Sequence, residues 1–144
     1  MFLGTYEHTI DEKGRMTIPA RFRELILGGA YLTQGIDNNL VVILADNFER
    51  VMAQIELQSG TDPNIRLLRR KLFPNAQRIE VDRLGRILIA EAHRSYAQLA
   101  DKAIVVGLGS NFEIWSPELW QEQNEKLSDE NFTLELKKYN LPSL

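Results

Sequence analysis

Two short segments of the sequence repeat an aspartate, a glycine and an arginine at one spacing. They read Asp-Glu-Lys-Gly-Arg at residues 11–15 and Asp-Arg-Leu-Gly-Arg at residues 82–86. An aspartate and an arginine four residues apart across a tight turn can form a charge-assisted pair that stiffens the turn. The glycine between them supplies the positive φ that such a turn needs. Taken alone, the pattern fits a structural role and a functional role equally well.

Duplication of this segment favours nucleic-acid recognition. A pseudo-two-fold pair of such loops makes a compact basic element, and arginine reads guanine O6 and N7 bidentately in the major groove. A hairpin or β-ribbon is narrow enough to enter that groove. The candidate DNA-binding residues are therefore Arg15, Arg86, Lys13, Arg83 and Arg21, with Asp11, Asp82, Gly14 and Gly85 as their motif partners. Arg23 and Arg94, on short helices that follow the loops, are further candidates for phosphate contacts.

Enzyme chemistry finds little support in the sequence. The chain has two histidines and no cysteine, which excludes disulfides, thiolate catalysis and cysteine-ligated metal sites. It contains no HExxH, GxSxG or GxxxxGK[ST] segment, the usual signs of zinc peptidases, serine hydrolases and phosphate-binding loops. His93 is expected to be a partly exposed helix residue. We therefore expect no enzymatic activity, no catalytic residue, no metal and no cofactor.

The charge distribution allows a positive surface on a chain of net charge −3. Residues 62–94 carry eight arginines and lysines against four acidic side chains, whereas residues 110–144 carry three basic and seven acidic ones. A net negative protein can still present one basic face. The basic cluster Arg66, Arg69, Arg70 and Lys71 fits either the solvated face of a helix or a further DNA contact.

The similarity extends beyond the two segments and indicates a duplicated unit of about 70 residues. Residues 35–43 and 107–115 match as Gly-Ile-Asp-Asn-Asn-Leu-Val-Val-Ile and Gly-Leu-Gly-Ser-Asn-Phe-Glu-Ile-Trp. Each match is followed by a helix-start signal, Asp46 in the first unit and Ser116-Pro117 in the second; Asp62-Pro63 starts a further helix. Each unit is therefore predicted to hold short strands on either side of its Asp-x-x-Gly-Arg segment, called the box below, then a short helix, a hairpin and a closing helix.

Two half-sheets of one pattern would leave exposed edges if they stayed apart. Pairing them about an internal pseudo-two-fold axis removes those edges. We predict an α+β fold: a small β-barrel from two tandem, intertwined halves with flanking helices. The expected divisions are a first repeat over 1–60, a connecting basic helix over 61–77, a second repeat over 78–128 and a helical tail over 129–144, all in one compact unit.

The sequence resembles the MraZ family of bacterial transcriptional regulators, within the AbrB/SpoVT/MazE-like superfamily. The resemblance is carried by both boxes, the Met-Phe start, Arg21-Phe22-Arg23 and Phe112-Glu113-Ile114-Trp115. The resemblance implies two fused AbrB-like swapped-hairpin halves and self-association into closed rings, octamers or dodecamers. It also implies binding of double-stranded DNA at short G-rich direct repeats upstream of the regulator's own division and cell wall operon, usually with repression. By this resemblance Arg15 and Arg86 contact DNA, with Asp11 and Asp82 as their partners.

The main alternative is an AbrB/MazE-like antitoxin or protein-interaction scaffold, whose acidic tail, residues 118–135, would hold a basic toxin. A disordered tail would suit that function, whereas Trp115, Trp120 and Phe132 favour a folded one. No apolar run reaches the roughly 18 residues of a membrane span, and the first residues lack the form of a signal peptide. We expect a cytoplasmic, nucleoid-associated protein with no membrane partner.

Overall fold

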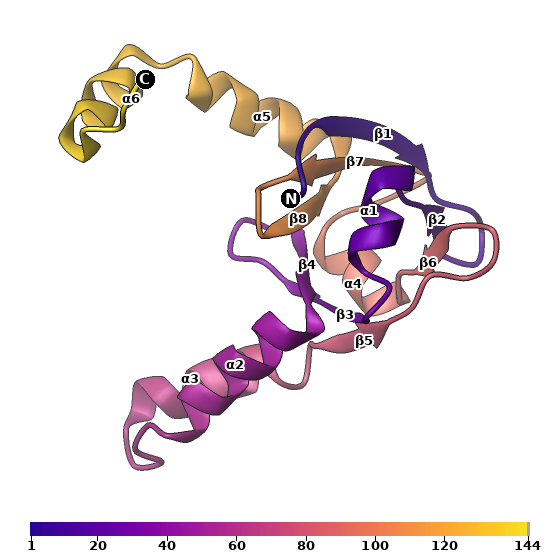
Figure 1. Cartoon of the computed structure of the whole chain (residues 1–144), viewed down its shortest axis with the longest axis horizontal. Coiled ribbons are helices and arrows are strands. Elements are labelled where there is room, and N and C mark those ends of the chain that lie inside the picture. Colours follow the sequence, from indigo (N-terminus) through magenta and orange to yellow (C-terminus); the bar gives the residue numbers. More distant parts are fainter. Residues whose placement is uncertain (144) are drawn as a thin grey trace.

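Eight strands form two antiparallel sheets in the computed structural model, which describes residues 1–143 (Figure 1). The larger sheet has the order β1-β7-β8-β4-β3-β5, and β2 pairs with β6 in a two-stranded ribbon. The strands are β1 (Thr5–Thr9), β2 (Arg15–Thr17), β3 (Ala30–Gln34), β4 (Leu40–Leu44), β5 (Gln77–Ile79), β6 (Arg86–Leu88), β7 (Lys102–Gly107) and β8 (Asn111–Trp115).

Strands are exchanged between the two halves of the chain. Strand β1 of the first half pairs with β7 of the second half, and β5 of the second half pairs with β3 of the first. The central contact of the large sheet joins β4 to β8, and the ribbon joins β2 to β6. Every strand of the first half therefore pairs with a strand of the second, which agrees with the prediction of two intertwined halves. The sheet order also reads alike from either edge, as a pseudo-two-fold relation requires.

The predicted closure into a barrel is not confirmed. Within residues 1–143 the edge strands β1 and β5 do not pair with each other, so the larger sheet is open. Strand β1 instead runs into the first loop, and an isolated bridge joins Ile10 to Met16 of the ribbon. The ribbon is thus a second, two-stranded sheet whose buried residues Met16 and Ile87 belong to the same core as those of the larger sheet.

Helices flank the sheets and extend from them (Figure 1). Their bounds are α1 (Ala20–Leu25), α2 (Ala45–Glu56), α3 (Pro63–Leu72), α4 (Glu91–Tyr96), α5 (Pro117–Leu127) and α6 (Glu130–Leu136), followed by the 3₁₀ turn η1 (Lys137–Tyr139). The α2–α3 pair projects away from the sheets on one side, and α5 leads to α6 on another. None of the described helices is both long and apolar enough to cross a bilayer.

Side-chain capping begins three of these helices. The carboxylate of Asp62 accepts from the backbone N–H of Asn64, and the hydroxyl of Ser116 accepts from that of Leu119, as the sequence signals predicted. Asp129 begins α6 in the same way as Asp62 begins α3. The prediction that Asp46 caps α2 is wrong, because this helix already starts at Ala45 and Asp46 lies in its first turn.

Aromatic and aliphatic side chains from both halves share one core. The rings of Phe2 and Phe112 lie 5.0 and 5.1 Å from that of Phe22, and Tyr6 lies 5.5 Å from it. Phe2, Phe22 and Phe112 are all buried. Because Phe22 belongs to α1 and Phe112 to β8, this cluster joins a helix of the first half to the sheet of the second.

His93 belongs to this buried interior, so the expectation of a partly exposed residue is wrong. Its side chain is buried, and Nε2 lies 2.6 Å from the backbone carbonyl oxygen of Asn75. The position connects α4 to the segment before β5. The predicted tail over 129–144 begins with α6, and its last residue, 144, lies outside the described residues.

Candidate nucleic-acid interface

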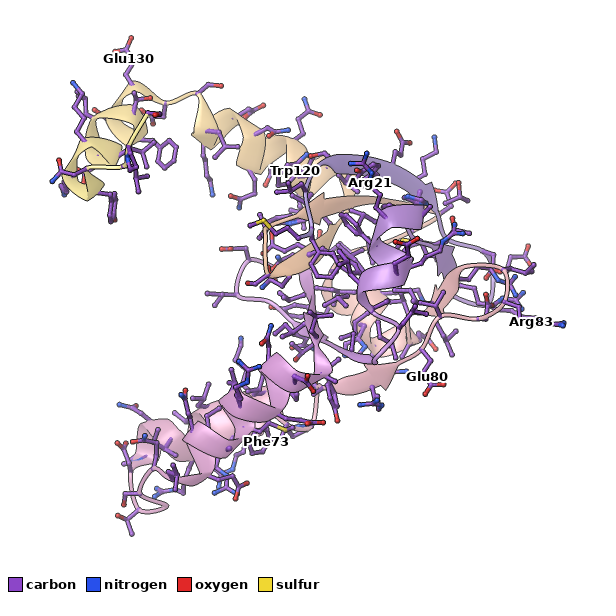
Figure 2. All side chains as sticks on the ribbon, in the orientation of Figure 1. Arg21, Phe73, Glu80, Arg83, Trp120 and Glu130 are labelled. Carbon is purple, nitrogen blue, oxygen red and sulfur yellow. The ribbon has the colours of Figure 1, made fainter. Side chains whose placement is uncertain are left out.

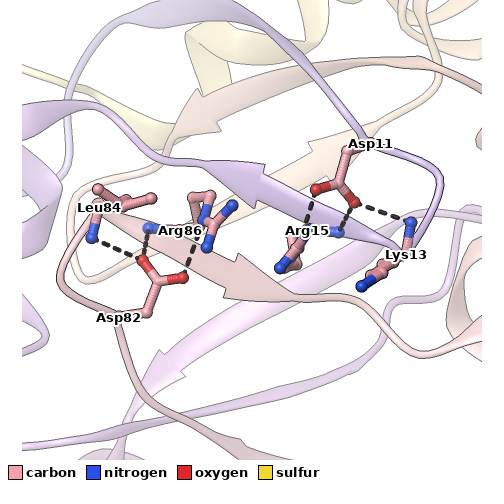
Figure 3. Close-up of polar contacts among 6 residues, drawn as sticks. All are labelled: Asp11, Lys13, Arg15, Asp82, Leu84 and Arg86. Carbon is pink, nitrogen blue, oxygen red and sulfur yellow. Dashed lines mark hydrogen bonds and ion pairs between the residues drawn. The ribbon is translucent and has the colours of Figure 1, made fainter.

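The first loop is organised by the carboxylate of Asp11 (Figure 3). Its Oδ1 accepts the backbone N–H groups of Lys13 and Arg15 at 2.9 Å each, and its Oδ2 accepts Nε of Arg15 at 2.8 Å. The backbone N–H of Gly14 donates to the Asp11 carbonyl at 3.0 Å, and Gly14 has a φ of 85°. The aspartate therefore fixes both the turn and the orientation of the arginine side chain.

The second loop repeats these contacts at the same distances. Asp82 accepts the backbone N–H groups of Leu84 and Arg86 at 2.9 Å each and Nε of Arg86 at 2.8 Å. Gly85 donates to the Asp82 carbonyl at 3.0 Å and has a φ of 77°. Both predicted Asp–Arg pairs and both positive-φ glycines are confirmed. Residue types at the second and third loop positions differ, so the shared geometry comes from the aspartate, glycine and arginine.

The β2–β6 ribbon places the two loops at its opposite ends (Figure 3). Met16 lies opposite Ile87 at the centre of the ribbon, and both side chains are buried. Because successive residues of a strand point to opposite faces, the neighbours of this pair lie on the outer face. Arg15 faces Leu88 there, and Arg86 faces Thr17, so the two arginines are diagonal neighbours on one surface. The ribbon thereby brings both predicted base-reading residues together.

Both loop carboxylates are held in the charged form. The pKa of Asp11 is below its ordinary value, first because of the hydrogen bond from the Arg15 backbone N–H and then because of the Arg15 side chain. The pKa of Asp82 is lowered in the same way by Arg86. Each arginine therefore has an anionic partner at neutral pH, and the pair keeps its charge-assisted geometry.

The remaining predicted residues lie around this ribbon to different degrees. Lys13 and Arg83 are exposed in the loops, and Figure 2 shows Arg83 pointing outward from the end of its loop. Arg21 is exposed on α1 at some distance from that loop end. The basic α3 lies on the α2–α3 projection, away from both loops (Figure 1). There, Arg69 contacts Glu56 at 3.5 Å and lies over the ring of Phe73.

Two arginines that the sequence suggested as phosphate contacts point toward the protein instead. Arg23 is half-buried, and its Nε donates to the carbonyl oxygen of Ile18 at 3.0 Å. Arg94 is half-buried as well, with Nε enclosed in the interior. Their sequence separation equals that of the two boxes, a regularity that relates them to the loops. Thr17 and Leu88 lie opposite the two loop arginines on the outer face of the ribbon, and nothing in the sequence pointed to either residue.

The chain is similar to known proteins over most of its length. The family model described as "MraZ protein, putative antitoxin-like" matches the chain twice, over residues 1–71 and 72–139. A protein of Thermomicrobium roseum named "Transcriptional regulator MraZ" is 47% identical over 130 residues, which cover 90% of this chain and 92% of the relative. Proteins with the same name from Herpetosiphon aurantiacus and Mycolicibacterium smegmatis are 42% and 37% identical, over 90% and 92% of this chain and 91% and 92% of the relatives.

The two matched segments correspond to the two halves that exchange strands, and relatives of nearly full length share the name of a regulator rather than of an enzyme. The duplicated loop, the exchanged halves and these similarities lead to one assignment: the chain belongs to the MraZ family of transcriptional regulators.

Proposed function

We propose that this protein is a sequence-specific DNA-binding regulator that represses its own division and cell wall operon. It binds short G-rich direct repeats in the promoter through the loops that carry Arg15 and Arg86. The observation that carries this proposal is the twofold occurrence of one Asp–Arg loop at the two ends of a single ribbon. As such a regulator, it acts in the cytoplasm at the nucleoid.

The contacts of each arginine leave donors for a base. Asp11 and Asp82 engage Nε and the backbone N–H of their arginines, and the Nη atoms have no hydrogen bond within residues 1–143. An arginine oriented by a carboxylate can direct its outer nitrogens to O6 and N7 of guanine. Lys13, Arg83 and Arg21 are exposed cations around the ribbon and contact phosphates, which adds affinity without sequence preference.

Two loops supply too few contacts for tight binding by one chain, so we propose a closed ring, an octamer or a dodecamer. Several loops around one rim that face evenly spaced repeats gain affinity from effective concentration. Large apolar side chains that are exposed on the two projections support self-association: Leu57, Leu67, Phe132, Leu134 and Leu136. A variant that stays monomeric should lose far more affinity than the removal of one loop arginine causes.

The antitoxin alternative receives less support. Its acidic tail would suit a disordered segment that folds on a basic toxin, but the tail here contains α5 and α6, each begun by a side-chain cap. Tight binding of a basic partner protein together with a failure to bind promoter DNA would favour the alternative.

The proposal is tested by titrating the protein into a fluorescent DNA duplex that has the sequence upstream of the protein's own gene. Arg15→Ala and Arg86→Ala should each weaken binding roughly 5- to 150-fold, the equivalent of about 1–3 kcal/mol per guanine contact. Arg50→Ala removes the same charge from an exposed position on α2 and serves as the matched control. Binding to a scrambled duplex should be weaker and steeply dependent on salt. Undiminished promoter binding by both loop variants would refute the assignment.

A further inference from the structure

Each loop glycine lies beneath an arginine from the other half of the chain. A Cβ atom added to Gly85 would lie 2.3 Å from Cζ and 2.5 Å from Nε of Arg23, which belongs to α1. A Cβ added to Gly14 would lie 3.1 Å from both Cζ and Nε of Arg94, which belongs to α4. The arrangement thus occurs twice, and in both cases the arginine and the glycine come from opposite halves.

Hydrogen bonds to backbone carbonyl groups tie the same residues together. The N–H of Ile18 donates to the carbonyl of Gly85 at 3.1 Å, and the carbonyl of Ile18 accepts Nε of Arg23 at 3.0 Å. The residue after β2 is therefore bound to both the opposite loop and the arginine that covers it. On the other side, the N–H of Ile89 donates to the carbonyl of Gly14 at 2.8 Å.

We propose that Arg23 and Arg94 are positioning residues that hold the DNA-binding loop of the opposite half, and that they are not phosphate contacts. The inference rests on the proposed function for the role of the loops. A planar guanidinium packed on a glycine limits movement of the turn, and a loop that is already ordered loses less freedom when DNA binds. The pairs are crossed: Arg23 supports the loop of Arg86, and Arg94 supports the loop of Arg15.

Crossed pairing has a measurable signature in double-mutant cycles of promoter binding. Arg23→Ala should weaken binding about tenfold in the wild-type background and in the Arg15→Ala background. In the Arg86→Ala background its effect should fall below about threefold, because the side chain that it positions is already absent. Arg94→Ala should give the mirror pattern and lose its effect in the Arg15→Ala background.

Two further measurements separate positioning from phosphate binding. The affinity constant K for DNA falls as salt rises, and loss of a phosphate contact reduces the magnitude of the slope of log K against log salt by about 1. Loss of a positioning residue leaves that slope unchanged. Arg23→Lys keeps the charge and would restore most of a phosphate contact, but it lacks the planar group and should bind as weakly as Arg23→Ala. A reduced slope, or recovery with lysine, would overturn the inference while the DNA-binding function stands.

Hydrogen exchange without DNA tests the inference independently of the proposed function. Arg23→Ala should accelerate exchange of the loop amides of Gly85 and Arg86 at least fivefold and leave those of Gly14 and Arg15 unchanged. Arg23→Lys provides the same test if the alanine variant is unstable, and Arg50→Ala is the control on an exposed helix. Unchanged exchange in the opposite loop would overturn the inference. If both loop variants, Arg15→Ala and Arg86→Ala, bind the promoter like the wild type, the proposed function fails, and the exchange result alone decides whether Arg23 positions the loop.

Discussion

Replacing Gly14 with alanine should destabilise the protein through two separable effects. The residue has a φ of 85°, where an alanine costs about 1–2 kcal/mol. Its added Cβ would also lie 2.5 Å from the carbonyl oxygen of Ile89, which is backbone and follows directly after β6. Relief of that contact requires the loop and strand to separate. The separation weakens the bond from the Ile89 N–H to the Gly14 carbonyl, worth about 1 kcal/mol.

Gly109 provides a control for the conformational effect. It has the same φ of 85°, and an added Cβ would meet nothing within 4 Å. Urea unfolding followed by tryptophan fluorescence should therefore give a loss of about 1–2 kcal/mol for Gly109→Ala and roughly 2–3 kcal/mol for Gly14→Ala. Equal losses for the two variants would refute the argument that the loop is packed against the opposite strand.

Four further predictions concern the neighbouring structure. Gly85→Ala should cost more than Gly109→Ala, and the excess should vanish in the Arg23→Ala background, because the atoms nearest to its Cβ belong to Arg23; unfolding of the double variant measures this. Phe22→Ala should lower the free energy of unfolding by about 3–5 kcal/mol, since the ring is buried among three others; a loss below about 1 kcal/mol would contradict the packing. Folding lowers the pKa of Asp11, so the stabilisation from this carboxylate is present above its ordinary pKa of 3.8 and is lost as pH falls through the pKa of the folded state. The difference in unfolding free energy between wild type and Asp11→Asn should therefore stay constant near neutral pH and shrink below about pH 4. A difference that changes near neutral pH would contradict this. Burial and the charge of Arg23 lower the pKa of His8 below 6.5, so stability should fall as pH decreases through that value, and His8→Gln should remove this dependence in unfolding measurements made from about pH 7 to 5.

Local features of the site could be predicted from the sequence because each depends on residues close together in the chain. The Asp–Arg pairs and the glycine turns involve contacts four residues apart or fewer. The caps at Asp62 and Ser116 follow from the same local chemistry. Duplication of the boxes also indicated that two such loops form one surface.

Three features that depend on distant contacts could not be predicted. Nothing local shows that Arg23 turns onto Gly85, because the two residues meet only after the halves exchange strands. His93 is buried where its ring meets the backbone carbonyl of Asn75, 18 residues earlier in the chain, and composition does not reveal that contact. The larger sheet stays open because its edge strands β1 and β5 do not pair, and this too depends on distant parts of the chain. The rule that exposed edges are disfavoured suggests closure, but it does not decide whether two short edge strands reach each other.

Because both halves belong to one chain, the two loops need not have the same sequence. In a homodimer every substitution occurs twice, so both loops must present the same side chains to DNA. Here one loop carries Glu12 and Lys13 where the other carries Arg83 and Leu84, although the supporting aspartate, glycine and arginine are unchanged. Under the proposed function, the two ends of the ribbon can therefore diverge in base preference, and a single subunit can read a DNA site without internal symmetry.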